Sequence, residues 1–118
     1  MTMEEVSKAY GIPMSVLLEY ERWGLCGEAE KRMGARHYDE TDLERLSLIL
    51  TLYDVGFSSG EIERYMRLAA SDGDSMQERM AMLRKKRDGT LDELHFKQRQ
   101  LDRLDYLRYR LAQSGKEK

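Results

Sequence analysis

The residues whose types and spacing most clearly suggest a function lie near the amino terminus, in a helix-turn-helix pattern. The turn AYGIP, residues 9–13, precedes the segment MSVLLEYERWGL, which we expect to form a helix that ends at Gly24. A helix, a tight glycine turn and a second helix present the reading helix in many DNA-binding proteins. The outer face of this second helix would carry Ser15, Leu18, Glu19 and Arg22. Arg22 suits a phosphate contact, whereas the carboxylate of Glu19 would repel phosphate.

Metal binding and catalysis find little support in the other reactive side chains. Cys26 is the only cysteine, and a thiolate metal site needs two or more cysteine or histidine ligands at workable spacing. The two histidines, His37 and His95, form no such motif with it. The sequence contains no Gly-rich phosphate loop and no HExxH or CxxC motif. We therefore expect no metal site, no cofactor and no enzymatic activity.

The elements around the reading helix have local start and stop signals. The capping box TMEE, with Thr2 as N-cap, predicts a first helix of about two turns that ends at Gly11. Four residues of the second helix are spaced for packing against a core: Val16, Leu17, Tyr20 and Trp23. Residues 26–37, CGEAEKRMGARH, combine small residues with mixed charges, and we expect a short two-stranded hairpin there. Its cations are Lys31, Arg32 and Arg36.

Two further helices follow the hairpin. Asp39 is the expected N-cap of the first. The apolar stripe of this helix would be Leu43, Leu46, Ile49, Leu50 and Tyr53. Gly56 ends it, and Ser58 with Glu61 forms another capping box. The inward residues of the next helix would be Ile62, Tyr65, Met66 and Ala69. These helices would complete a head of residues 1–70.

A long helix follows the linker SDGDS at residues 71–75. Residues 76–113 have an imperfect heptad pattern, and a lone amphipathic helix of this length must bury its apolar stripe somewhere. Self-association as a coiled coil is the natural solution, so we expect a dimer. The expected interface consists of Met80, Leu83, Leu94, Leu101, Leu104 and Leu111. Residues 114–118 would form a disordered tail.

Composition indicates a charged, helix-rich protein rather than a membrane protein. The 118 residues are 41% hydrophobic and 36% charged, and no apolar run reaches the roughly 20 residues of a membrane span. The amino terminus does not look like a signal peptide and the single cysteine fits a reducing interior, so we expect a cytoplasmic protein. Residues 1–70 carry 8 Lys/Arg against 13 Asp/Glu, and the remainder carries 12 against 9. The acidic balance of the head argues against strong nonspecific DNA affinity.

The order of the elements and three local motifs resemble the MerR family of bacterial transcription regulators. YERWGL at residues 20–25 is similar to the family's tyrosine, acid and Gly-Leu. GARHYDETDLERL at residues 34–46 is similar to its Gly-Tyr-Arg, tyrosine and acidic helix start. DVGFSSGEI at residues 54–62 is similar to its Gly-Phe-Ser and Glu-Ile. The matches keep their order and spacing along the head.

The resemblance implies an all-α fold with a small β-hairpin wing. A winged helix-turn-helix head would be followed by a long dimerisation helix that forms an antiparallel coiled coil. The resemblance also implies a homodimer that binds an inverted repeat in double-stranded promoter DNA and distorts it, so that RNA polymerase can use the promoter. It further implies an effector, a small molecule or a partner held between the head and the coiled coil, which no residue identifies. Dimer symmetry that mirrors operator symmetry agrees with general rules of DNA recognition.

The sequence departs from the family pattern on the reading helix and on the wing. Pro13, Leu18 and Glu19 replace a small hydroxyl residue and an Arg-Tyr pair, and Ala35 replaces a tyrosine. The DNA contacts that we expect are Ser15, Tyr20, Arg22, Lys31, Arg32 and Arg36. The departures leave an alternative open, a MerR-like dimer with degenerate heads that binds another protein. An architectural DNA-bending factor of the recombination-directionality type fits the long dimerisation helix less well.

Overall fold

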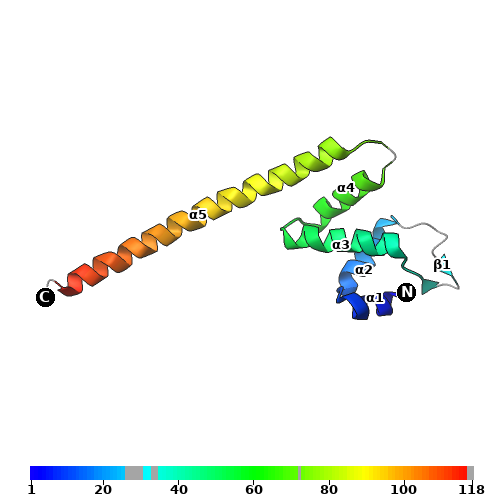
Figure 1. Ribbon diagram of the computed structural model, residues 1–118, viewed down its shortest axis with the longest axis horizontal. Coiled ribbons are helices and arrows are strands. Elements are labelled where there is room, and N and C mark those ends of the chain that lie inside the picture. The colour runs from blue at the N-terminus through cyan, green and yellow to red at the C-terminus, as the bar shows by residue number, and fades with distance from the viewer. Residues whose placement is uncertain (26–30, 33–34, 72, 117–118) are drawn as a thin grey trace. The chain divides into compact units, whose positions relative to one another are not determined.

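The computed structural model is mostly helical and describes residues 1–25, 31–32, 35–71 and 73–116, with only the backbone at 31–32, 35–36 and 116. Its elements in chain order are α1 (Met3–Tyr10), α2 (Met14–Trp23), β1 (Lys31–Arg32), β2 (Ala35–Arg36), α3 (Glu40–Asp54), α4 (Ser59–Ala70) and α5 (Met76–Lys116). The chain divides into two units, Met1–Arg79 and Met80–Lys118. The first unit is the head, and Figure 1 shows the four shorter helices gathered in it. No helix within the described ranges is both long and apolar enough to cross a membrane.

The first helix begins and ends where the sequence predicts. Thr2 accepts a hydrogen bond from the backbone N–H of Glu5 at 3.3 Å, and Gly11 ends α1 in the left-handed conformation at φ 65°. Residues with a Cβ atom rarely adopt this conformation, so glycine is what allows the turn into α2. The hydroxyl of Ser7 donates to the carbonyl of Ile12 at 2.8 Å and closes the turn. α1 therefore packs against α2 through a short, fixed connection.

The second helix turns its apolar residues into the core of the head. Pro13 is the N-cap residue, and Gly24 ends α2 in the left-handed conformation at φ 66°. The buried residues of α2 are Val16, Leu17, Tyr20 and Trp23. These are the four residues that the spacing predicted, so the predicted packing face of α2 is confirmed.

The third helix starts at the predicted N-cap but buries a different stripe. Asp39 accepts a hydrogen bond from the N–H of Asp42 at 2.9 Å, and Asp42 accepts one from the N–H of Asp39 at 3.0 Å. The buried apolar residues of α3 are Leu46, Ile49 and Leu52. Three residues of the predicted stripe are only half-buried: Leu43, Leu50 and Tyr53. The sequence pattern missed Leu52 because α3 carries more apolar residues than its core-facing side can hold.

The fourth helix packs against α3 and starts at the predicted capping box. The hydroxyl of Ser58 accepts from the N–H of Glu61 at 3.2 Å, and Glu61 accepts from the N–H of Ser58 at 2.9 Å. The buried residues of α4 are Ile62, Tyr65 and Met66. Ala69 is exposed, contrary to the prediction, because it lies in the last turn of α4, whose other residues are also mostly exposed.

The first turn of α5 belongs to the head. Ser75 is buried, and its hydroxyl donates to the carbonyl of Leu68 at 2.7 Å. Nε of Arg79 donates to the hydroxyl of Ser75 at 3.0 Å, and the Arg79 guanidinium lies 6.0 Å from the ring centroid of Tyr65. These contacts fix the start of α5 on α4. The head thus extends to Arg79, beyond the predicted end at residue 70.

The rest of α5 forms the second unit and exposes most of its apolar side chains. The helix continues to Lys116, so residues 114–116, which we expected in a disordered tail, are helical. Its 41 residues correspond to a length of about 60 Å. The exposed apolar residues include all six predicted for the dimer interface: Met80, Leu83, Leu94, Leu101, Leu104 and Leu111. Phe96, Tyr106, Leu107 and Tyr109 are exposed as well.

Candidate nucleic-acid interface

The exposed face of α2 is short and carries one charge. It consists of Met14, Ser15, Leu18 and Arg22. Met14, Leu18 and Arg22 follow each other at intervals of four residues, so they lie along one side of the helix. The side chain of Leu18 is 56% exposed, and that of Arg22 is 70% exposed. Of the contacts predicted on α2, Ser15 and Arg22 are therefore at the surface.

Tyr20 lies inside the head, which corrects its prediction as a DNA contact. Its side chain is fully buried, and its hydroxyl donates to Oδ1 of Asp42 at 2.6 Å. Burial raises the pKa of Tyr20 to about 12, with an opposing effect of Arg45 and a further increase caused by the Asp42 carboxylate. The tyrosine thus joins α2 to α3, and its side chain is not accessible to a phosphate.

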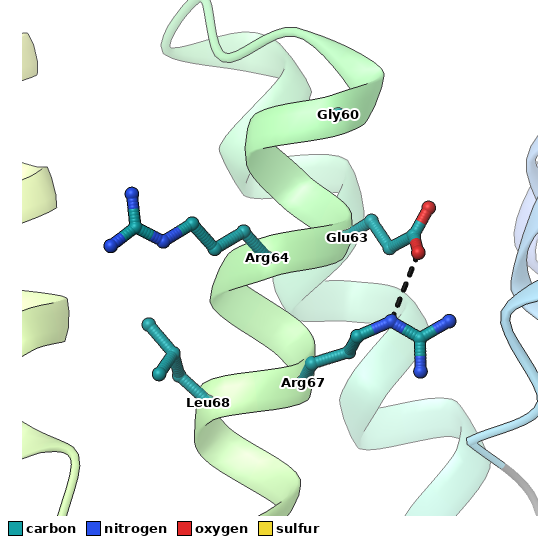
Figure 2. Close-up of a pocket in the computed structure, with 5 residues that line it drawn as sticks. All are labelled: Gly60, Glu63, Arg64, Arg67 and Leu68. Carbon is teal, nitrogen blue, oxygen red and sulfur yellow. Dashed lines mark hydrogen bonds and ion pairs between the residues drawn. The ribbon is translucent and has the colours of Figure 1, made fainter.

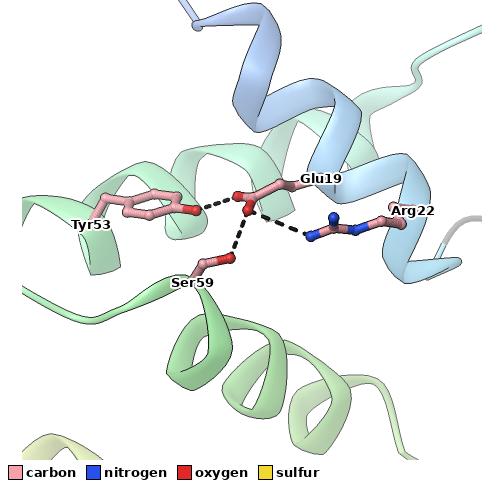
Figure 3. A network of polar contacts seen from close by, with 4 residues as sticks. All are labelled: Glu19, Arg22, Tyr53 and Ser59. Atoms are coloured by element: carbon pink, nitrogen blue, oxygen red, sulfur yellow. Dashed lines mark hydrogen bonds and ion pairs between the residues drawn. The ribbon is translucent and has the colours of Figure 1, made fainter.

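Glu19 is hydrogen-bonded within the head, so the expectation that its carboxylate faces outward against phosphate is wrong. Its carboxylate accepts from the hydroxyl of Tyr53 on α3 and from the hydroxyl of Ser59 on α4, the latter at 2.7 Å. Figure 3 shows these two hydroxyls and the Arg22 guanidinium, 3.6 Å away, converging on the carboxylate. The hydrogen bonds from Tyr53 and Ser59 lower the pKa of Glu19. The negative charge of Glu19 is therefore compensated within the head, beside the exposed face of α2.

Two arginines that sequence reasoning missed hold the carbonyl end of α2. Arg45 of α3 donates to the carbonyl of Leu25 at 3.0 Å, and Arg67 of α4 donates to the carbonyl of Trp23 at 3.1 Å. Cations suit a helix carboxyl end because the last carbonyls have no partner within the helix. Arg67 also pairs with Glu63 at 2.9 Å, and Figure 2 shows this pair on the surface of α4. The hollow beside it is lined by Gly60, Glu63, Arg64, Arg67 and Leu68.

The three predicted cations after α2 lie on a two-stranded antiparallel ribbon. β1 pairs with β2 so that Lys31 is opposite Arg36 and Arg32 is opposite Ala35. The structure describes the backbone of these four residues, and residues 26–30 and 33–34 lie outside the described ranges. Most of the hairpin predicted at residues 26–37, including Cys26, therefore lies outside the described residues. The hydroxyl of Tyr38, just after β2, donates to Glu21 on α2 at 3.2 Å.

The comparison with family models identifies this architecture. The model of the MerR HTH family regulatory protein matches residues 1–69, which is more than half of the chain. The chain belongs to the MerR family. A second MerR model, MerR, DNA binding, matches residues 43–113 and so covers most of α3, all of α4 and most of α5. The resemblance seen in the sequence motifs is thereby confirmed.

Curated MerR proteins match this chain at moderate identity. A probable heavy metal-dependent transcriptional regulator of Haemophilus influenzae is 36% identical over 69 residues, which are 58% of this chain and 54% of that protein. The mercuric resistance operon regulatory protein of Shigella flexneri is 33% identical over 79 residues, which are 66% of this chain and 54% of that protein. The chain thus spans about half the length of the curated relatives it matches.

Solved MerR structures share the fold. A putative MerR family transcriptional regulator from Listeria monocytogenes has a TM-score of 0.70 at 24% identity, over 90% of this chain and 81% of that chain. HiNmlR, a MerR family regulator that lacks the sensor domain and was solved bound to promoter DNA, has a TM-score of 0.68 at 25% identity. That match covers 89% of this chain and 84% of HiNmlR. The helical MerR architecture with a long carboxyl-terminal helix therefore holds for this chain.

Proposed function

We propose that this MerR-family chain is a transcription regulator that binds an inverted-repeat promoter element as a homodimer and distorts it. The observation that carries the proposal is the packing of α2 against the other helices of the head. Its apolar residues are buried, and the carboxylate of Glu19 is hydrogen-bonded to α3 and α4. The remaining exposed face has a single charge, that of Arg22. Such a helix can enter a major groove without repelling phosphate.

The paired strands after α2 are proposed to be the wing that grips the DNA backbone. Lys31, Arg32 and Arg36 follow one another on this ribbon within a head of acidic net charge. Phosphate contacts supply essentially all nonspecific affinity, and each one releases counterions. The proposed promoter partner is supported by HiNmlR, which has the same fold and was solved on promoter DNA.

The second unit is proposed to form the dimer. Its six predicted interface residues range in exposure from 36% for Leu83 to 76% for Leu111. A helix of this length with so much exposed apolar surface is stabilised when a second helix covers that surface. An antiparallel coiled coil of two α5 helices would bury the stripe and give one reading head per half-site. RNA polymerase and a small-molecule effector remain partners that the family resemblance predicts.

The test measures fluorescence anisotropy of labelled duplexes that cover the region upstream of the chain's own gene. A regulator should prefer one duplex with an inverted repeat over a scrambled duplex of equal length. Its affinity should fall steeply between about 50 and 200 mM salt, because phosphate contacts release counterions. In the double variant Lys31→Ala with Arg36→Ala, the salt slope should fall by about 1 for each phosphate that the variant no longer neutralises.

A charge-matched control keeps this test specific. Arg84 and Lys85 are exposed on α5, so replacing both by alanine removes the same charge from the other unit. This control should retain the salt slope and the affinity of the unaltered protein. The competing function, a dimeric protein-interaction module with degenerate heads, draws support from the acidic head. It predicts that no duplex is preferred and that both double variants behave alike, and this result would overturn the regulator proposal.

A further inference from the structure

The exposed face of α2 is largely apolar at the place where a reading helix meets base edges. Met14 is 40% exposed and Leu18 is 56% exposed, and they lie one helical turn apart. Ser15 is the only hydroxyl on this face, and Arg22 is one further turn along. Neither Met14 nor Leu18 can donate or accept a hydrogen bond of ordinary strength. The face therefore has few groups with which to read guanine, adenine or cytosine.

The major groove presents one apolar group, the methyl group of thymine. Guanine and adenine present acceptors or donors there, and cytosine presents an amino group that a carboxylate reads well. An apolar side chain pressed against these polar edges leaves them without partners, which costs free energy. Glu19 would be the natural reader of cytosine, but its carboxylate is occupied by Tyr53 and Ser59.

We propose that α2 selects its DNA half-sites by apolar contact with thymine methyl groups, made by Leu18 with Met14 beside it. This inference rests on the proposed function and adds the chemical feature of the target that the head distinguishes. The charge pattern agrees with it, because the only charged group on the exposed face is the cation Arg22, which suits the adjoining phosphates.

The size of the effect follows from the area of one methyl group. Burying one methyl or methylene group contributes about 0.8 kcal/mol, which is about a fourfold change in affinity. A dimer that makes one such contact with each head would bind about fifteenfold more weakly when both methyl groups are removed. Deoxyuridine removes the methyl group of thymine and leaves its hydrogen-bonding edge intact, so it isolates this effect.

The experiment starts from the full chain and a randomised duplex library, from which bound duplexes are selected and sequenced. Anisotropy then compares the selected duplex with one in which deoxyuridine replaces every thymine of the half-sites. A third duplex carries deoxyuridine only outside the half-sites. We expect enrichment of thymine at one or more half-site positions and about fifteenfold weaker binding of the half-site deoxyuridine duplex. The third duplex should bind like the original.

Variants assign the effect to the residues. Leu18→Ala should weaken binding to the thymine duplex and lose most of the discrimination against deoxyuridine, and Met14→Ala should lose part of it. Val55 is an apolar residue exposed to a similar degree, 50%, but it lies after α3. Val55→Ala should therefore keep the full discrimination. Because these side chains are exposed, the variants should stay folded, which the fluorescence of Trp23 reports.

The outcomes separate this inference from the proposed function. If no sequence is enriched, the proposed function fails and the inference fails with it. If a selected duplex is bound in a salt-dependent manner but tolerates deoxyuridine in its half-sites, the regulator proposal stands and methyl readout is refuted. If discrimination survives in both Leu18→Ala and Met14→Ala, these residues are not the readers, and the inference is refuted as well.

Discussion

Removal of the Glu19 carboxylate should lower the free energy of unfolding of the head. In Glu19→Ala the hydroxyls of Tyr53 and Ser59 lose their shared acceptor, and Arg22 loses its ion pair. Hydrogen bonds to a charged group contribute about 1.5–3 kcal/mol each. The Glu19 side chain is 27% exposed, so water replaces part of each bond. We expect a loss of about 2 kcal/mol in the free energy of unfolding, which lowers the Tm of a domain this size by about 10 °C.

The assay is guanidinium unfolding at fixed protein concentration, followed by the fluorescence of Trp23. This residue is the only tryptophan and is 3% exposed in the head, so it reports the head alone. Glu44 is an exposed glutamate on α3, and Glu44→Ala should change stability by less than about 0.5 kcal/mol. In a double-mutant cycle, Glu19→Ala and Tyr53→Phe should show a coupling of at least about 0.5 kcal/mol. Zero coupling, or equal losses in the two glutamate variants, would refute the reasoning.

The stabilisation by Glu19 should also depend on pH. The hydrogen bonds from Tyr53 and Ser59 lower the pKa of Glu19 below its unfolded value of 4.5. The folded state therefore favours the carboxylate, and the stabilisation is present above pH 4.5 and lost as the pH falls through the folded-state pKa. The stability difference between the unaltered protein and Glu19→Gln should be constant near neutral pH and shrink in acid. A difference that grows in acid would contradict this assignment.

Three further predictions concern the buried tyrosine, the dimer and the end of α2. Tyr20→Phe should lower the free energy of unfolding by about 1–2 kcal/mol, because a buried carboxylate loses a partner. Burial raises the Tyr20 pKa from 10.0 to about 12, so urea unfolding should show a loss of stability between these pH values. The loss should be smaller in Tyr20→Phe, where the raised pKa of Tyr53 still contributes. Leu101→Asp with Leu104→Asp should give a monomer by light scattering; a dimer of unchanged mass would exclude these residues from the interface. Arg67→Ala should lower the free energy of unfolding by about 1 kcal/mol, because the Trp23 carbonyl loses its donor. Thermal unfolding measures this, and an unchanged Tm would show that the interaction does not stabilise the head.

Signals that act within a few residues were readable from the sequence. The N-cap at Asp39, the capping box at Ser58 and the glycine stops at Gly11 and Gly24 appear in the structure where the sequence predicts them. Each depends on a donor and an acceptor in the same turn, or on one backbone conformation. The four-residue packing face of α2 was equally accessible, because helical periodicity alone determines which residues share a side.

The contacts that position the site were not readable, because their partners are far apart in the sequence. Glu19 reaches Tyr53 and Ser59 across 34 and 40 residues, and Tyr20 reaches Asp42 across 22. No local pattern distinguishes a carboxylate that bonds across helices from one that faces solvent. The side that Glu19 occupies on α2 was therefore predicted as outer surface, although the neighbouring helices supply two hydroxyls to it.

The different positions of Leu18 and Glu19, one exposed and one bonded to other helices, have a consequence for how such a protein can acquire new DNA targets. These residues are adjacent in the chain, but Leu18 contributes exposed atoms and Glu19 contributes bonds to two other helices. Under the proposed DNA contact by α2, substitutions at Leu18, Ser15 and Met14 should therefore alter sequence preference without first requiring compensating changes elsewhere. A library randomised at these three positions with Glu19 kept constant should remain largely folded, and new half-site preferences can be selected directly from it.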